Sequence, residues 1–210
     1  MTTRLSGIVV GGPPEPWAAL GFAVDDRDHI RFANGALQLS GAGAGLLGLV
    51  VDGIPTAGVS TGRRSVDLEG VPVTAGDVEP GADHPNGAFE LDHVVLRTPH
   101  LDDTSAAVEA VLGLACRRVR ETSTVRQAFH RFPDQGGVRG CIVEVVEDER
   151  ATVTTLWGLV VNVADLDAAV DELGPEVIGD VKPAVQAGRG IATVRRDAGL
   201  GVPVALMSPA

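Results

Sequence analysis

The sequence contains no tyrosine, and only 3% of its residues are aromatic. Its two cysteines, Cys116 and Cys141, are too few for a disulfide framework and match no metal-ligand spacing. No apolar run approaches the roughly 20 residues that a helix needs to span a bilayer, and the N-terminal segment lacks the apolar stretch of a signal peptide. These absences predict a cytoplasmic protein whose two thiols are reduced and buried.

Positive charge is also scarce. The chain has 17 Lys and Arg against 28 Asp and Glu, a formal net charge of −11. This balance argues against a nucleic-acid footprint, which needs clustered positive charge, and against binding to anionic membrane surfaces. With 210 residues, 44% of them hydrophobic and 21% charged, the chain has the composition of a folded protein of one or two domains.

Four short apolar runs repeat along the chain, at residues 5–10, 46–51, 91–96 and 156–161. Each is six residues long and β-branched, which is typical of a buried strand. The third position of the runs is occupied in turn by Gly7, Gly48, His93 and Gly158. The pattern predicts a unit that is repeated four times, with these four residues at equivalent positions.

The third and fourth copies match over a longer stretch, with an offset of 65 residues. In each, an aspartate, Asp102 or Asp167, precedes a helical pattern and is predicted to be its N-cap. Gly113 and Gly174 follow these patterns and are predicted to end the helices. Strand signals then follow at residues 115–121, 126–133 and 141–148 in the third copy, and at 176–181, 190–196 and 202–208 in the fourth. Both copies therefore predict a β-α-β-β-β module.

The first two copies are shorter. The first predicts a small helix at residues 15–20 and strands at 22–25, 29–33 and 36–40, whereas the second predicts no helix and only short strands at 66–68 and 71–74. Residues 76–87 are rich in Asp, Glu, Pro and Gly, as linkers are. We expect a reduced domain over residues 1–75, a linker over 76–87 and a complete two-module domain over 88–210.

Residues 86–102, Asn-Gly-Ala-Phe-Glu-Leu-Asp-His-Val-Val-Leu-Arg-Thr-Pro-His-Leu-Asp, resemble the opening of a vicinal-oxygen-chelate domain. This is the superfamily of glyoxalases, bleomycin-resistance proteins and dioxygenases. The resemblance is specific over residues 89–148, good over 153–209 and weak over 4–73. It implies an α+β fold in which paired β-α-β-β-β modules curl into a half-barrel around a cleft for a small molecule.

The same resemblance implies where a metal would bind. His93 on the first strand and Glu144 on the last strand of the third copy match the family's ligand positions, and Glu144 is the best candidate for a catalytic group. The matching residues of the fourth copy are Gly158 and Ala205, which cannot bind a metal, and those of the first copy are Gly7 and Gln38. His130 could supply a third ligand to a divalent metal. Two ligands hold an ion poorly, so we expect no bound metal cofactor.

The strand period of two places Asp92 and Val94 on the opposite face from His93, and Val143 and Val145 opposite Glu144. His93 and Glu144 are thus expected to face one cleft.

Several other residues are candidates for the cleft. Arg126 and Arg189 lie on or beside middle strands, where an arginine can clamp a carboxylate or phosphate; the alternative is that they pair with acidic side chains on the outer face. The aromatic residues Trp17, Trp157, Phe129 and Phe132 are candidate walls, with core packing as the alternative. His29 and His84 are expected to be solvated.

Two classes of function follow. We expect a protein that binds a small organic molecule in the cleft between modules, with a degenerate metal site, and that forms a homodimer if it resembles the family in this respect. The alternative is a metal-dependent isomerase, lyase or dioxygenase on a small oxygenated substrate. The absence of tyrosine disfavours the extradiol dioxygenases, which the resemblance associates with a tyrosine near the metal.

Overall fold

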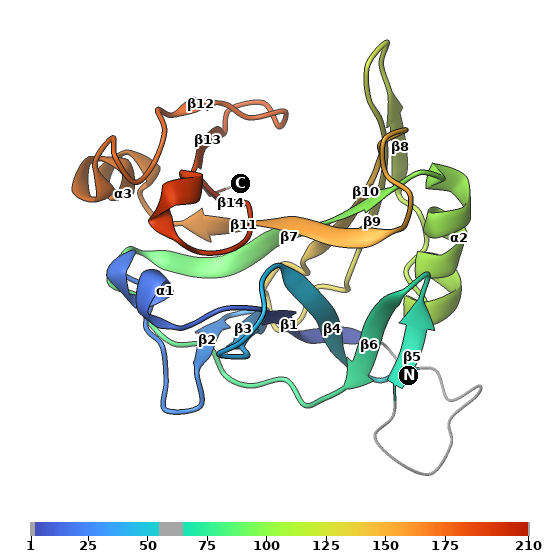
Figure 1. Ribbon diagram of the computed structural model, residues 1–210, viewed down its shortest axis with the longest axis horizontal. Helices are drawn as coiled ribbons and strands as arrows, with labels where there is room; N and C mark the ends of the chain where they lie inside the picture. The colour runs from blue at the N-terminus through green and yellow to red at the C-terminus, as the bar shows by residue number, and fades with distance from the viewer. Residues whose placement is uncertain (1–2, 55–64, 210) are drawn as a thin grey trace.

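The computed structural model describes residues 3–54 and 65–209, which form two β-sheets lying one above the other (Figure 1). The lower, six-stranded sheet has the order β2-β3-β1-β4-β6-β5, and the upper, eight-stranded sheet has the order β12-β13-β14-β11-β7-β10-β9-β8. The lower sheet contains β1 (Arg4–Val10), β2 (His29–Phe32), β3 (Gly35–Leu39), β4 (Leu46–Asp52), β5 (Ser65–Leu68) and β6 (Val71–Ala75). The upper sheet contains β7 (Ala88–Thr98), β8 (Arg118–Glu121), β9 (Arg126–Arg131), β10 (Ile142–Glu147), β11 (Thr155–Val163), β12 (Lys182–Pro183), β13 (Gly190–Thr193) and β14 (Val204–Met207).

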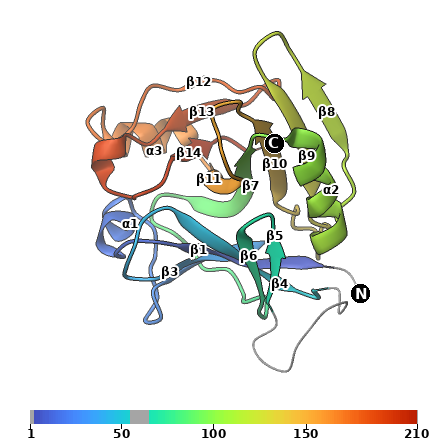
Figure 2. The same cartoon turned by 45° about the vertical axis from the view of Figure 1, so that its right-hand side comes forward.

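Three α-helices and one 3-10 helix complete the described part of the chain: α1 (Glu15–Ala19), α2 (Leu101–Leu112), α3 (Leu166–Leu173) and η1 (Arg196–Ala198). Helix α2 buries Leu101, Thr104, Val108 and Leu112, a helical spacing of three and four residues that gives it one core-facing side. Figure 2 shows α2 flanking β9 and β10 of the upper sheet, with β5 of the lower sheet beside it. No helix among the described residues is long and apolar enough to cross a membrane.

The strand order confirms the paired modules of an α+β fold. In the upper sheet the first strand of each module lies parallel to its last strand, β7 beside β10 and β11 beside β14, and the two first strands pair antiparallel at the centre. The lower sheet repeats this arrangement with fewer strands: β1 lies parallel to β3, β4 lies parallel to β6, and β1 pairs antiparallel with β4.

The register of the central strands confirms the predicted equivalence of positions. His93 pairs with Val160, two residues beyond Gly158, and Gly158 pairs with Val95, two residues beyond His93. This pairing is symmetric, as equivalent positions in antiparallel strands require. In the lower sheet Gly7 pairs with Val50 and Gly48 with Val9, which is the same symmetric offset.

A β-bulge precedes each of these four positions. The ladder skips Asp92 and Trp157 between β7 and β11, and it skips Ser6 and Leu47 between β1 and β4. A bulge interrupts the strict alternation of side chains, so the residue before each equivalent position does not simply point to the opposite face. The expectation that Asp92 lies opposite His93 was therefore wrong, with consequences for the site described below.

Several local predictions were also wrong. Residues 22–25 form no strand, and residues 176–181 contribute only an isolated bridge between Ile178 and Val194. Helix α2 begins one residue before Asp102, after His100, and the N-cap of α3 is Asp165, whose carboxylate accepts a hydrogen bond from the N–H of Ala168. Each helix starts at the leucine before the predicted N-cap, Leu101 or Leu166, because this side chain is buried as part of the first helical turn. Gly113 and Gly174 end the helices as predicted.

One hydrophobic core runs through both sheets. It includes Ile8 and Leu49 of the lower sheet and Val94 and Leu159 of the upper sheet. Asn34 joins the sheets further, because its side chain donates to the carbonyls of Leu91 and Arg139 and accepts from the N–H of Leu91. We propose that residues 1–75 and 88–210 are two domains of the same repeated type. The linker 76–87 connects them, and they pack against each other through one shared core.

His84 in the linker is buried, contrary to the expectation that it is solvated; it is 7% exposed. Its Nδ1 accepts a hydrogen bond from the N–H of Ala23 and its Nε2 donates to the carbonyl of Arg31. The ring also packs against Phe22 and Phe32, at centroid distances of 6.0 and 5.0 Å. The linker is therefore fastened to the lower sheet by this side chain.

The burial of His84 predicts a dependence of stability on pH. Burial lowers the pKa of this imidazole below its ordinary value, so the unfolded chain binds the proton more readily than the folded chain. The contribution of His84 is therefore complete above about pH 6.5, the ordinary histidine pKa, and is lost as the pH falls below it. We expect His84→Gln to lower the free energy of unfolding by about 2 kcal/mol at pH 8 and by less at pH 5.5. Urea titrations at the two values measure this, and an equal loss at both would contradict it.

Candidate functional site

A cavity of about 530 Å³ lies on the concave face of the eight-stranded sheet. Both modules contribute to its walls, since β7 to β10 supply one side, and the segment from Pro183 to Ala187 with β13 and β14 supplies the other. The edge strands β8 and β12 rise on opposite sides of the curled sheet (Figure 2). The volume is within the range of small-molecule sites.

The side of the cavity built by β7 to β10 is polar. His93 and Glu144 face each other there, with 3.4 Å between His93 Nε2 and Glu144 Oε2. Gln127 donates a hydrogen bond to Glu144 and accepts one of 2.8 Å from Arg120. Arg118 lies beside Arg120 on the same face of β8, and among the ion pairs of the described residues neither arginine takes part. Two guanidinium groups thus open onto the cavity of an acidic protein.

Burial determines the protonation of Glu144. Removal from water raises the pKa of its carboxyl above the ordinary value, an effect that the neighbouring His93, the hydrogen bond from Gln127 and the charge of Arg120 offset only in part. The neutral, proton-bearing form of Glu144 is therefore more accessible than that of a surface glutamate.

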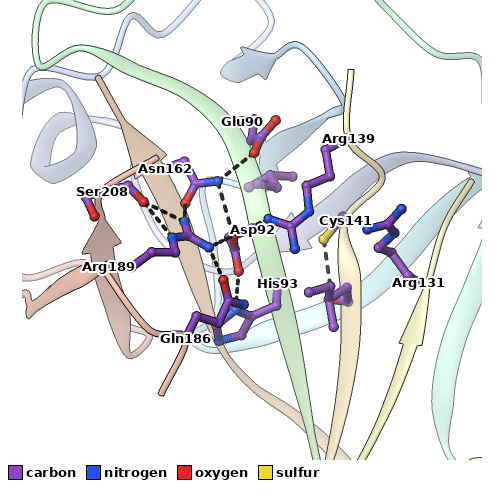
Figure 3. A network of polar contacts seen from close by, with 12 residues as sticks. Glu90, Asp92, His93, Arg131, Arg139, Cys141, Asn162, Gln186, Arg189 and Ser208 are labelled. Carbon is purple, nitrogen blue, oxygen red and sulfur yellow. Dashed lines mark hydrogen bonds and ion pairs between the residues drawn. The ribbon is translucent and has the colours of Figure 1, made fainter. Parts of the chain in front are cut away.

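A buried polar network lies behind His93 (Figure 3). Asp92, displaced by the bulge, accepts a hydrogen bond of 2.9 Å from His93 Nδ1 through one carboxylate oxygen. Its other oxygen accepts from Arg189 at 2.8 Å and from Asn162 at 3.2 Å. Burial alone would raise the pKa of Asp92, but the bonds from His93 and Arg189 outweigh it and hold the pKa well below its usual range. Asp92 is thus an ionised carboxylate that can only accept.

Arg189 connects this network to the opposite wall. Besides Asp92, it donates to the side chains of Asn162 and Gln186 and to the carbonyl of Ser208. Gln186 belongs to the segment that lines the cavity. Arg189 does not itself line the cavity. It holds the segment that contains Gln186 and the end of β14 at Ser208, whereas the sequence predicted that it would bind a carboxylate or phosphate of the ligand.

The side of the cavity built by the fourth module is apolar. Val160, Ala205 and Met207 form a small hydrophobic cluster separate from the main core, with Ala184 and Ile191 packed against it. Phe129 and Ile142 continue the apolar surface toward the polar side. The cavity therefore has a charged end and an apolar end.

Comparison with solved structures finds methylmalonyl-CoA epimerases. A variant of the Streptomyces coelicolor enzyme in complex with 2-nitronate-propionyl-CoA is 20% identical, with a TM-score of 0.50 over 59% of this chain and 99% of that chain. The Mycobacterium tuberculosis methylmalonyl-CoA epimerase is 21% identical, with a TM-score of 0.47 over 59% of this chain and 90% of that one. This chain has the vicinal-oxygen-chelate fold. No protein-family model and no curated protein matches the sequence.

The vicinal-oxygen-chelate fold implies a metal at the centre of the concave face, and the residues present do not fit one. Pairing of β7 with β10 and of β11 with β14 confirms that Ala205 corresponds to Glu144, as Gly158 corresponds to His93. Only one of the two modules therefore supplies ligand atoms, whereas zinc sites of proteins use at least three protein ligands. Ala205 belongs to the apolar cluster of Val160, Ala205 and Met207, whose side chains carry no nitrogen or oxygen donor.

Gly158 does more than replace a metal ligand, because the absence of a side chain at this position allows the neighbouring strand to approach closely. A Cβ at this position would lie 2.9 Å from the carbonyl oxygen of Pro203 on the neighbouring strand. Gly48 in the lower sheet meets the carbonyl of Pro72 at 2.8 Å in the same way. In the second module of each sheet, a glycine on the first strand thus lies against a proline at the last strand.

Two predicted site residues lie away from the cavity. His130 is fully buried on the helix-facing side of β9, where its Nδ1 donates to the carbonyl of Leu114 and its Nε2 bonds Ser105. Arg126 is on the same outer side and pairs with Asp102 and Glu147. The alternation of β9 explains both positions, since Gln127 and Phe129 occupy the inner face.

The aromatic candidates divide in the same way. Phe129 lines the cavity, Trp17 and Phe132 are in the core, and Trp157 is 48% exposed at its bulge.

Asp25, His29 and Glu79 place potential ligand atoms within 4.8 Å of one another. Arg27 pairs with Glu79 at the surface and Arg31 lies 3.3 Å from Asp25. His29 is half-buried in this cluster and 3.8 Å from Glu79, rather than solvated as expected. The arginines already neutralise the carboxylates, so the cluster is an ion-pair network at the edge of the lower sheet.

The sequence analysis missed Asp92, Arg118, Arg120 and Gln127. A signal for the last three existed, because Arg118 and Arg120 alternate on a strand and pair with Phe129 and Gln127 across the β8–β9 hairpin. A second signal was the sequence Gly-Val-Pro-Val, at residues 70–73 and again at 201–204, which aligns the two second modules independently of the first strands. Nothing in the sequence marks the bulge that brings Asp92 to His93.

Proposed function

We propose that this protein binds a small organic anion in the cavity of the eight-stranded sheet. The observation that carries the proposal is the division of the cavity: Arg118 and Arg120 stand at one end, and the apolar side chains of Ala184, Val185, Ile191 and Met207 line the other. Guanidinium groups recognise carboxylates and phosphates through charge-assisted hydrogen bonds, and the apolar end favours a hydrocarbon tail. The neighbouring epimerase structure holds an acyl-CoA derivative, an organic anion of this general kind.

Arg120 is the more informative of the two arginines. It is partly buried, its one side-chain hydrogen bond goes to the neutral Gln127, and it forms no ion pair, although its charge also acts on Glu144. Its hydrogen bond to Gln127 also continues to Glu144, which ties the anion-binding end to the floor of the cavity.

A fluorescent aromatic sulfonate, 8-anilino-1-naphthalenesulfonate, tests the proposal. We expect one molecule to bind per chain and Arg120→Ala to weaken its Kd about tenfold, because a hydrogen bond to a charged group is worth about 1.5 kcal/mol. Fluorescence titration at two salt concentrations measures both values. Arg150→Ala, which removes an exposed arginine outside the cavity, is the matched control. Equal affinities of all three proteins would contradict the proposal.

The alternative is a metal-dependent enzyme of this fold, favoured by the approach of His93 and Glu144. In that case purified protein incubated with Zn²⁺, Mn²⁺, Ni²⁺ or Fe²⁺ and then desalted retains about one ion per chain, and His93→Ala abolishes its retention. Elemental analysis distinguishes the two functions, because the anion-binding protein retains none.

A further inference from the structure

The orientation of the His93 ring is fixed from behind. Asp92 receives Arg189 and Asn162 on one carboxylate oxygen and lies 2.9 Å from His93 Nδ1 through the other, so Nδ1 of His93 is the donor of the bond between them. Nε2 is then the ring atom presented to the cavity, where its nearest ionisable neighbour is Glu144. A carboxylate that orients a histidine in this way is the arrangement that proteins use to present the second ring nitrogen for chemistry.

Asp92 itself is held with little freedom. Its side chain is 1% exposed and receives Arg189 and Asn162 in addition to His93. Asn162 also donates to the buried Glu90 at 2.6 Å, and Arg139 lies 3.7 Å from Asp92. Figure 3 shows these side chains converging on Asp92; they come from β7, from β11 and from the loops that precede β10 and β13. Such a network keeps an active group in place before any ligand arrives.

A metal would need ligands beyond His93 and Glu144, and the fourth module supplies none. Nε2 is consequently available to a bound molecule. We propose that His93 is a general base in a metal-free site, that Asp92 is its positioning residue, and that the substrate is an organic anion with an acidic C–H or O–H beside an electron-withdrawing group. The inference rests on the proposed binding function and adds a reaction to it.

The proton-transfer step needs no co-reactant. Nε2 takes the proton, the electron pair of the broken bond stays on the substrate, and the imidazolium that forms is paired with Asp92 at Nδ1 and faces Glu144 at Nε2. Return of the proton to the substrate restores the starting state. Arg118 and Arg120, in the same cavity, would hold the anionic group of the substrate.

The base can be tested without its natural substrate. 5-Nitrobenzisoxazole is a small aromatic carbon acid: removal of its C3 proton drives cleavage of the N–O bond and releases the coloured 2-cyano-4-nitrophenolate. We expect saturable turnover by the purified protein and an at least tenfold loss of kcat in His93→Gln, because positioned general bases contribute about 10²–10⁴-fold. Arg150→Ala is expected to keep the wild-type rate.

The rates of the variants show whether His93 or Glu144 is the base. Turnover that survives in His93→Gln, or that is lost in Glu144→Gln and not in His93→Gln, would overturn the proposal. The absence of turnover in the wild-type protein would also overturn it, and anion binding measured on the same sample would show whether the binding function still stands.

The role of Asp92 has its own measurement. In the wild-type protein the ring-nitrogen NMR signals of His93 are expected to show a proton on Nδ1. Asp92→Asn is expected to reduce kcat with little change in KM and to alter the population of that tautomer, since an amide can donate as well as accept. A signal with the proton on Nε2 alone in wild-type protein would contradict this role. Because this measurement uses the wild-type protein, it does not depend on the stability of the variant.

Discussion

Replacement of Arg189 by methionine is expected to lower the free energy of unfolding by about 3–5 kcal/mol, the usual cost of breaking a buried ion pair from one side. The side chain is 4% exposed and its partner Asp92 is 1% exposed. Methionine retains most of the apolar stem but leaves the carboxylate without its main cationic partner. His93 and Asn162 compensate only partly, because both already bond Asp92 in the wild-type protein.

Chemical denaturation of Arg189→Met measures this loss, and Arg150→Ala is the matched control, expected to change stability by less than about 0.5 kcal/mol. The double variant Arg189→Met/Asp92→Leu is expected to be more stable than the sum of the two single losses predicts, because neither charge then remains unpaired. Additive losses would show that the two side chains act independently and would contradict the network described here.

Replacement of Gly158 by alanine is expected to cost about 1–3 kcal/mol, because the added Cβ meets backbone rather than a movable side chain. The contact is the carbonyl oxygen of Pro203, at 2.9 Å, with the Pro203 Cβ at 3.2 Å. Gly158→His is expected to lose at least as much stability and to gain no metal affinity, although it restores a ligand type at the family position. Denaturation and elemental analysis measure the two effects.

Gly179→Ala is the control for the glycine variants, since its Cβ would meet the Thr193 carbonyl at 3.5 Å, an ordinary contact. Gly48→Ala is expected to resemble Gly158→Ala, because the Pro72 carbonyl lies 2.8 Å from the Cβ it would add. If Gly158→Ala were as stable as Gly179→Ala, the close approach of the two strands would have no energetic role.

The sequence predicted the repeated strands and the position of His93 because these depend on local pattern. Apolar, β-branched runs are typical of buried strands, so the equivalent positions could be aligned by residue type alone. Glu144 could be predicted to share the cleft because β10 is regular from Ile142 to Glu147 and alternation holds along it.

Other features depended on contacts that the sequence does not contain. Asp92 faces His93 only because of a bulge, which is a property of the pairing between β7 and β11 and not of either strand alone. The side of β9 on which His130 and Arg126 lie depends on which face of that strand packs against α2. The burial of His84 depends on the path of the linker over the lower sheet. In each case several local structures are compatible with the sequence, and contacts between distant segments select one of them.

The unequal modules have a consequence for how a molecule can lie in the cavity. A site built from two matching halves would accept the same ligand in either of two orientations related by the pseudo-twofold axis. Here the guanidinium groups belong to one half and the hydrocarbon surface to the other, so a molecule with one charged end has a single favoured direction. His93, fixed on the central strand, then meets one face of that molecule and not the opposite face. The difference between the two modules therefore fixes the direction in which such a molecule lies.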